Sequence, residues 1–141
     1  MRVFLDTWVL VEKYKENNYA ERVLEAAKTL FETHISVITM AELVNVISRL
    51  YGDKEARIQF AYINSVPLIQ NPLTLGVAFK AGLLKTKYRF SLADAVILST
   101  AIATESDVLV TGGEKQYEKE WKNVNELKVA KLNEFVENHC P

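Results

Sequence analysis

The chain has 141 residues, of which 49% are hydrophobic and 25% charged, and its formal net charge is −1. This composition is typical of a globular protein, and the near-neutral charge argues against a strongly basic, non-specific nucleic-acid binder. Cys140 is the single cysteine, so an internal disulfide is excluded and a reducing compartment is expected. No apolar run is long enough for a transmembrane helix. We therefore expect one domain over residues 1–141, in the cytoplasm and not in a membrane.

Short apolar runs rich in β-forming residues alternate with amphipathic helical patterns in the first half of the chain. The predicted elements are a strand at residues 2–6, helices at 7–16 and 19–31, a strand at 34–37, and helices at 40–51 and 53–65. Thr39 is the expected N-cap of the helix at 40–51, and Gly52 is expected to end it.

The second half continues the alternation. The predicted elements are a strand at 66–69, a helix from 72 to 87, a helix at 92–104, a strand at 107–111, a helical stretch at 114–121, a strand at 127–132 and a helix at 133–139. Pro67 favours an edge position for its strand. Alternating strands and helices favour a parallel sheet covered on both faces, with ligands beyond the carboxyl ends of the strands.

Three acidic residues stand at the edges of apolar elements. Asp6 ends the first strand, whereas Glu42 and Asp94 lie in the first turns of predicted helices. Carboxylates are expensive to bury unless they are paired or bound to a metal. Three such residues, far apart in sequence, indicate a shared metal-binding site.

Each of these acids also has a purely structural interpretation. Asp6 fits a helix N-cap, and the spacings Thr39-x-x-Glu42 and Ser91-x-x-Asp94 both fit a capping box. The helix after Asp94 is apolar nearly all round and should be buried, so its carboxylate needs a compensating charge, a metal or a shifted pKa. Asp94 is therefore the most suggestive of the three.

The oxygen-rich set favours a hard divalent cation such as Mg²⁺, which activates water and neutralises charge during hydrolysis of a phosphodiester. No Cys/His cluster indicates zinc, and His34 and His139 are isolated, structural or surface residues. The sequence also lacks a P-loop and the GxGxxG and GxSxG motifs, which argues against nucleotide motors, dinucleotide enzymes and serine hydrolases.

Four sequence blocks in this order resemble those of PIN-domain proteins, above all the VapC-type toxin ribonucleases. The blocks are Phe4-Leu5-Asp6-Thr7, residues 35–43 (ISVITMAEL), residues 91–101 (SLADAVILSTA) and residues 107–112 (DVLVTG). The resemblance covers nearly the whole chain. It implies a three-layer α/β/α sandwich around a central, mainly parallel twisted sheet of about four to five strands.

The same resemblance implies an endoribonuclease that depends on Mg²⁺ or Mn²⁺. Asp6, Glu42 and Asp94 would hold the metal and orient the attacking water, with the hydroxyls of Thr7 and Thr111 beside the site. It further implies an RNA substrate, a homodimer, and a small antitoxin partner that inserts into the active-site groove.

One position departs from the family pattern. The family commonly has Thr-x-Asp after the last of these strands, whereas this chain has Thr111-Gly112-Gly113. Glu114 follows directly, and a glycine pair allows the backbone to aim it at the site. Glu114 equally fits an exposed place in the first turn of the next helix.

Cationic residues near the acids are candidate RNA contacts. Lys87 and Arg89 belong to a basic-aromatic cluster with Lys85 and Tyr88, just before Asp94, and Arg49 lies on the helix of Glu42. Such groups bind phosphates and stack on bases. A solvated helix end is the competing explanation of the cluster.

Two other functions stay open. A PIN-like domain with weak or no catalysis, acting by binding RNA or protein, is compatible with Gly113. A phosphatase with Asp6 as nucleophile is disfavoured, because the haloacid-dehalogenase pattern needs a second Asp where this chain has Trp8.

Overall fold

A computed structural model describes residues 1–141 of the chain. Its strands are β1 (Arg2–Leu5), β2 (Glu32–Ser36), β3 (Ile69–Asn71), β4 (Val108–Thr111) and β5 (Val129–Lys131). Its helices are α1 (Thr7–Tyr14), α2 (Asn18–Ala26), α3 (Val37–Tyr51), α4 (Asp53–Ser65), α5 (Leu75–Tyr88), α6 (Leu92–Ala103), α7 (Glu114–Gln116), the π-helical turn η1 (Tyr117–Trp121) and α8 (Leu132–His139).

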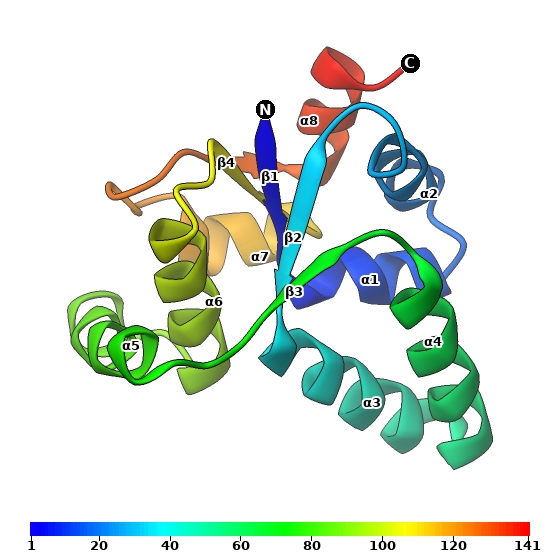
Figure 1. The fold of residues 1–141 in the computed structure, drawn as a ribbon, viewed down its shortest axis with the longest axis horizontal. Helices are drawn as coiled ribbons and strands as arrows, with labels where there is room; N and C mark the ends of the chain where they lie inside the picture. Colours follow the sequence, from blue (N-terminus) through cyan, green and yellow to red (C-terminus); the bar gives the residue numbers. More distant parts are fainter.

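The five strands form one sheet in the order β3-β2-β1-β4-β5, and every pairing is parallel. The predicted α/β/α sandwich with a parallel central sheet is thus confirmed (Figure 1). β1 lies in the middle, with β2 on one side and β4 on the other. The chain therefore reverses its direction of winding beside the carboxyl end of β1, where ligands of open α/β sheets bind.

Side chains of β1 alternate between two apolar cores. Val3 and Leu5 belong to the core under α1, α2, α3 and α8, whereas Phe4 belongs to the core under α5 and α6. This alternation follows from the two-residue period of a strand. Each fully buried side chain of this kind stabilises the fold by about 2 kcal/mol. Both layers consequently hold the end of β1, and the Asp6 that follows it, in place.

α6 is the most deeply buried helix. Every residue from Asp94 to Thr100 is buried, and Ser91 Oγ caps the helix by accepting a hydrogen bond from the Asp94 amide at 3.2 Å. The capping half of the predicted Ser91-x-x-Asp94 motif is therefore present. The helix nevertheless carries a buried carboxylate in its first turn.

Several predicted boundaries are wrong. The helix predicted at 19–31 ends at Ala26, and the helix predicted from residue 72 begins at Leu75. α3 begins at Val37 and not at residue 40, because Ser36 Oγ caps it by accepting from the Ile38 amide at 3.2 Å. Thr39 is therefore inside the helix and does not cap it. β3 comprises residues 69–71 and not 66–69, so Pro67 precedes the strand and leaves its ladder of hydrogen bonds intact.

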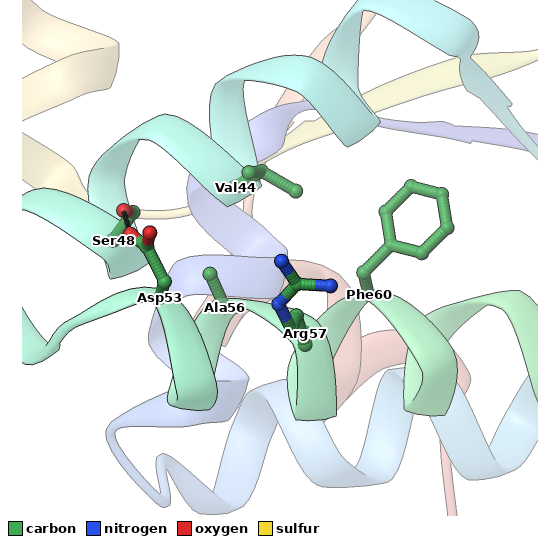
Figure 2. Close-up of a pocket in the computed structure, with 6 residues that line it drawn as sticks. All are labelled: Val44, Ser48, Asp53, Ala56, Arg57 and Phe60. Carbon is green, nitrogen blue, oxygen red and sulfur yellow. Dashed lines mark hydrogen bonds between the residues drawn. The ribbon is translucent and has the colours of Figure 1, made fainter.

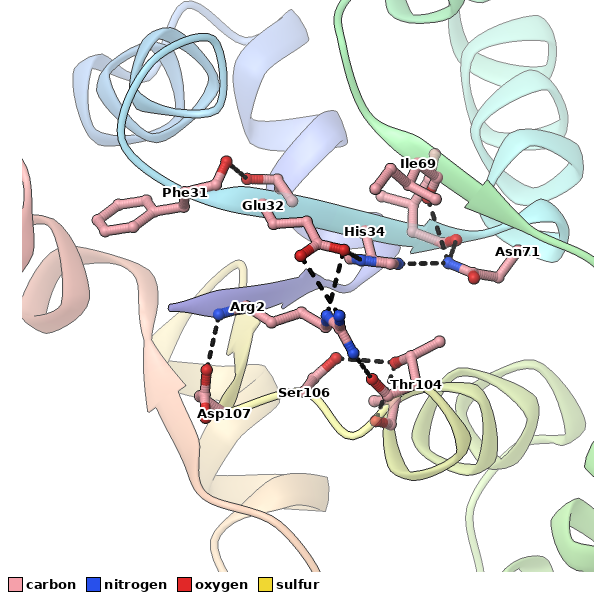
Figure 3. A network of polar contacts seen from close by, with 12 residues as sticks. Arg2, Phe31, Glu32, His34, Ile69, Asn71, Thr104, Ser106 and Asp107 are labelled. Atoms are coloured by element: carbon pink, nitrogen blue, oxygen red, sulfur yellow. Dashed lines mark hydrogen bonds and ion pairs between the residues drawn. The ribbon is translucent and has the colours of Figure 1, made fainter.

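A polar network runs across the sheet from the first residues of β1 and β2 to the last residue of β3 (Figure 3). Arg2 pairs with Glu32, whose Oε1 lies 2.8 Å from His34 Nε2. Asn71 Nδ2 donates to His34 Nδ1 at 3.0 Å, which fixes the ring between β2 and β3. His34 is buried and has both ring nitrogens engaged within the fold, as expected of a structural residue. None of the helices has the length and apolar character needed to span a membrane.

Candidate active site

Asp6 directly follows β1 and is almost completely buried, at 1% exposed. Its Oδ2 accepts from Thr111 Oγ1 at 2.8 Å, and its Oδ1 accepts from the amides of Gly112 at 3.2 Å and Val9 at 3.3 Å. Asp6 therefore caps α1 and is at the same time tied to the end of β4. Burial nevertheless outweighs these three donors and raises the pKa of Asp6 to about 7.

Gly112 is required by the close approach of two chain segments. A Cβ atom at this position would lie 2.4 Å from the carbonyl carbon of Trp8. Only a glycine lets the Gly112 amide come near enough to donate to Asp6. Gly113 differs, since its backbone is extended and a Cβ there would meet nothing within 4 Å.

Glu42 is held by hydroxyl groups. Thr7 Oγ1 donates to Glu42 Oε1 at 2.5 Å and is hydrogen-bonded with Thr39 Oγ1 at 3.1 Å. Thr7 and Thr39 are buried, whereas Glu42 is half-buried. Desolvation raises the pKa of Glu42, and the hydrogen bond from Thr7 lowers it in part. The predicted capping box is thus replaced by a link from Glu42 across to α1.

Asp94 completes the group of predicted acids. Burial is the largest cause that raises its pKa, to about 8, and the carboxyl group of Glu120 within hydrogen-bonding distance is the next. The negative charge of Asp94 in turn raises the pKa of both Asp6 and Glu42. The structure therefore brings the three acids from β1, α3 and α6 into one electrostatically coupled site.

The side chains of this site that could bind a metal offer only oxygen atoms. The groups that act on the three acids are hydroxyls, amides and other carboxylates, with no Lys, Arg or His among them. Such a set fits a hard divalent cation, which neutralises the carboxylates and completes its shell with water. No three acidic, His or Cys side chains converge on one point. The fit is therefore to an ion held by one or two carboxylates plus waters.

Glu114 takes the second of its two predicted places, in the first turn of α7, whereas Glu120 was not predicted at the site. Glu114 is exposed, and its Oε1 pairs with Lys131 Nζ at 3.2 Å. The acid that contacts Asp94 is Glu120, from η1, which our sequence analysis did not identify. No periodic pattern or motif marks Glu120, because a π-helical turn breaks the helical spacing. Its sequence signal is limited to the neighbouring Trp121, an obvious core residue.

The predicted RNA contacts lie on the surface. Arg49 and Arg89 are exposed, and Arg89 ends α5 with a positive φ of 59°. Lys87 Nζ pairs with Glu126 Oε2 at 3.0 Å and lies over the Tyr88 ring. Arg49 and Arg89 are thus available to a phosphate, whereas Lys87 would first have to leave Glu126.

Three solved structures, two of toxin–antitoxin complexes and one of a toxin, have folds similar to that of this chain. VapBC2 from Rickettsia felis, solved with a promoter DNA fragment, matches with a TM-score of 0.74 and 23% identity over 93% of this chain and 98% of that one. A toxin–antitoxin complex from Klebsiella pneumoniae has a TM-score of 0.67 and 21% identity over 92% and 97%. VapC20 of Mycobacterium tuberculosis, a sarcin–ricin loop cleaving toxin, has a TM-score of 0.63 and 18% identity over 76% and 86%.

These likenesses concern the fold, since the sequences are less than a quarter identical. No curated protein matches the chain. The model of the PIN domain, however, matches residues 3–122, which include all three predicted acids and Glu120. The chain is therefore a member of the PIN domain family.

Proposed function

We propose that this protein is a metal-dependent endoribonuclease, the toxin of a VapBC-type toxin–antitoxin pair. The observation that carries the proposal is the coupled set of Asp6, Glu42 and Asp94, whose pKa values are raised in a site without a cationic side chain. Perturbed carboxylates of this kind mark functional sites. The similar folds of toxin–antitoxin complexes and of a toxin that cleaves RNA support the same conclusion.

In this mechanism Asp94 would hold a divalent cation, Mg²⁺ or Mn²⁺, and Glu42 would orient the water bound to that ion. A bound cation would lower the pKa of water and stabilise the charge that develops on the phosphate. Asp6, locked by Thr111 and Gly112, keeps the end of β1 in place and adds negative charge to the site. Thr7 holds Glu42 in its orientation. Arg49 and Arg89 would bind phosphates of the RNA on either side.

The test is cleavage of RNA by the purified chain without a partner. Total RNA is incubated with the protein and Mn²⁺, and new 5′ ends are mapped by sequencing. Asp94→Asn, which is nearly isosteric and keeps the backbone amide bonded to Ser91, should abolish the cuts. Glu25→Gln, at an exposed and distant acid, should leave them unchanged. Cleavage that persists in Asp94→Asn would refute the assignment of the site.

A catalytically inactive domain that binds RNA or protein is the second candidate, and the observation in its favour is Gly113 in place of the family's acid. It predicts that the unmutated protein binds RNA and makes no cuts in any RNA pool that includes ribosomal and transfer RNA. It also predicts that Asp94→Asn leaves the affinity for RNA unchanged or higher, because a carboxylate repels phosphate.

We propose that the antitoxin docks between α3 and α4. A hollow of about 370 Å³ lies there, with Val44 from α3 opposite Arg57 and Phe60 from α4 (Figure 2). Phe60 is 44% exposed, and Arg57 is exposed and forms no ion pair. An antitoxin segment with an apolar anchor beside a carboxylate would fill the hollow and pair with Arg57. Val44 follows Glu42 by two residues and so lies on a different face of α3, and the bound segment would have to continue around this helix to reach the active site.

We further propose that a second copy of the chain covers the outer face of α5. Leu75, Phe79 and Leu83 follow at intervals of four residues on this face and are 89%, 73% and 59% exposed. The opposite face of α5 already packs on α6. The exposed Leu73, two residues before α5, extends this apolar face. A helix that is apolar on both sides is expected to be covered on both sides.

A further inference from the structure

Glu120 lies beside the predicted active site without a partner for its charge. Its carboxyl group is within hydrogen-bonding distance of that of Asp94, at the first turn of α6. We propose that Glu120 supplies the carboxylate that Gly113 lacks, so that Asp94 and Glu120 together hold the divalent cation of the proposed ribonuclease. The inference rests on the proposed function and adds to it a residue that no sequence motif marks.

The place of Glu120 is set by its neighbour. Trp121 is 1% exposed, and its ring packs against Phe90 with ring centres 4.9 Å apart. Phe90 directly precedes Ser91, the cap of α6. The contact therefore fastens the end of η1 to the start of α6, which carries Asp94, and holds Glu120 close to it.

The backbone of this segment is itself unusual. In η1 the Lys122 amide donates to the carbonyl of Tyr117, five residues earlier, which widens the turn by one residue. Turns of this type are rare and occur frequently at functional sites, because they re-aim side chains that a regular helix would direct elsewhere. Here the widened turn buries Trp121 and leaves Glu120 half-buried beside Asp94.

The other glutamates of the segment are neutralised, which sets Glu120 apart. Glu114 pairs with Lys131 at 3.2 Å, and Glu118 pairs with Lys122 at 3.3 Å. Glu120 forms no ion pair, and its carboxyl group lies within hydrogen-bonding distance of that of Asp94. Two like charges in contact repel, and a divalent cation between them would turn the repulsion into attraction.

The backbone at Gly113 does not require a glycine. Its φ is −165°, which any residue adopts, and a Cβ atom there meets nothing within 4 Å. An acid at this position is therefore sterically permitted in this chain. Its absence is consistent with a carboxylate that reaches the same site from further along the sequence.

The test measures Mn²⁺ binding to the full chain by calorimetry, together with thermal unfolding with and without Mn²⁺. Glu120→Gln should weaken Mn²⁺ binding about tenfold or more and reduce the Mn²⁺-induced rise in the melting temperature. At pH 9 in EDTA, where both carboxyls are ionised, the same variant should melt at a higher temperature than the unmutated chain, because the repulsion with Asp94 is removed. A residue with a purely structural role would not give these opposite shifts.

Two variants serve as controls. Glu114→Gln, at the exposed neighbouring acid, should bind Mn²⁺ like the unmutated chain. The double variant Gly113→Asp/Glu120→Gln should recover most of the lost affinity, because it restores a fourth carboxylate at the family's own position. Equal Mn²⁺ affinity of Glu120→Gln and the unmutated chain would overturn the inference, as would an equal loss in Glu114→Gln.

The outcome separates this inference from the proposed function. Mn²⁺ binding that needs Glu120, without any cleavage of RNA, would support the inference and refute the nuclease. RNA cleavage by the unmutated chain, together with normal Mn²⁺ binding by the Glu120→Gln variant, would support the nuclease and refute the inference. An unmutated chain that binds no Mn²⁺ would refute both.

Discussion

Thr7 and Glu42 form a 2.5 Å hydrogen bond that joins the first turn of α1 to α3. Thr7 follows Asp6 directly, so the same turn of chain fixes two of the three predicted acids. The bond also lies within a short chain of hydroxyls that ends at Thr39.

Replacing Thr7 with valine should impair the site while keeping its shape. Valine has the volume of threonine and lacks the hydroxyl, so Glu42 loses the donor that orients it and holds its pKa down. We expect RNA cleavage to fall about tenfold and the free energy of unfolding to fall by about 1–2 kcal/mol. Thr7→Ser retains the donor and should keep most of the activity. Equal cleavage by the valine and serine variants would contradict this role.

The stability of the metal-free protein should fall as the pH rises. The carboxyls of the unfolded chain titrate near pH 4, whereas Asp6 and Asp94 in the fold titrate near 7 and 8. Between about pH 4 and 8 the folded state therefore binds more protons than the unfolded state, and each unit of pH weakens folding. In EDTA we expect a melting temperature at pH 8 several degrees below that at pH 5.5.

Two comparisons assign this pH dependence to the site. Asp94→Asn should make the melting temperature fall less steeply with pH, because only Asp6, and no longer Asp94, holds an extra proton in the folded state. Saturating Mn²⁺ at pH 8 should raise the melting temperature of the unmutated chain, because the ion replaces the protons on the carboxyls. A decline of the same steepness in Asp94→Asn would show that other groups cause it.

The glycine pair after β4 should respond unequally to substitution. Gly112→Ala places a methyl group against the Trp8 carbonyl and displaces the amide that donates to Asp6. We therefore expect the free energy of unfolding to fall by about 2 kcal/mol or more, and RNA cleavage to fall as well. Gly113→Ala, with open space and an extended backbone, should change stability by less than about 0.5 kcal/mol. Chemical denaturation of both variants measures the difference, and similar midpoints would contradict it.

Charge on the outer face of α5 should prevent self-association. Phe79→Glu places a carboxylate at the centre of the apolar stripe, and we expect light scattering to give the mass of one chain where the unmutated protein gives two. Lys80→Glu, beside the stripe, changes the charge by two units where Phe79→Glu changes it by one, and should still leave the mass closer to that of the unmutated chain. A monomeric unmutated protein at micromolar concentration would contradict the proposed second copy.

Much of the fold is predictable because local patterns and tertiary packing agree. The apolar run before Asp6 and the uniformly apolar sequence after Asp94 correctly predict a buried strand and a buried helix. The start of α3 was mispredicted because Ser36 and Thr39 are both good caps, and only the pairing of β2 up to Ser36 selects the first. Local sequence does not contain that pairing.

The site was predictable to the extent that its residues stand at the ends of elements. Asp6, Glu42 and Asp94 were found in this way, but their roles stay predictions. The position of Glu120 depends on the contact between Trp121 and Phe90 and on a π-helical turn, neither of which has a sequence pattern. Glu114, which directly follows the glycine pair, was the natural candidate from sequence, and its pairing with Lys131 is a tertiary contact.

The hydrogen bond from Thr111 to Asp6 spans 105 residues of sequence. β1 is thus synthesised well before its partner β4, and Asp94 and Glu120 likewise follow late in the chain. A nascent or truncated chain that ends before β4 contains Asp6 and Glu42 but has neither the Thr111 nor the Gly112 donor. The proposed hydrolytic activity would consequently depend on completion of translation and folding, so that chains ending before β4 are expected to be inactive.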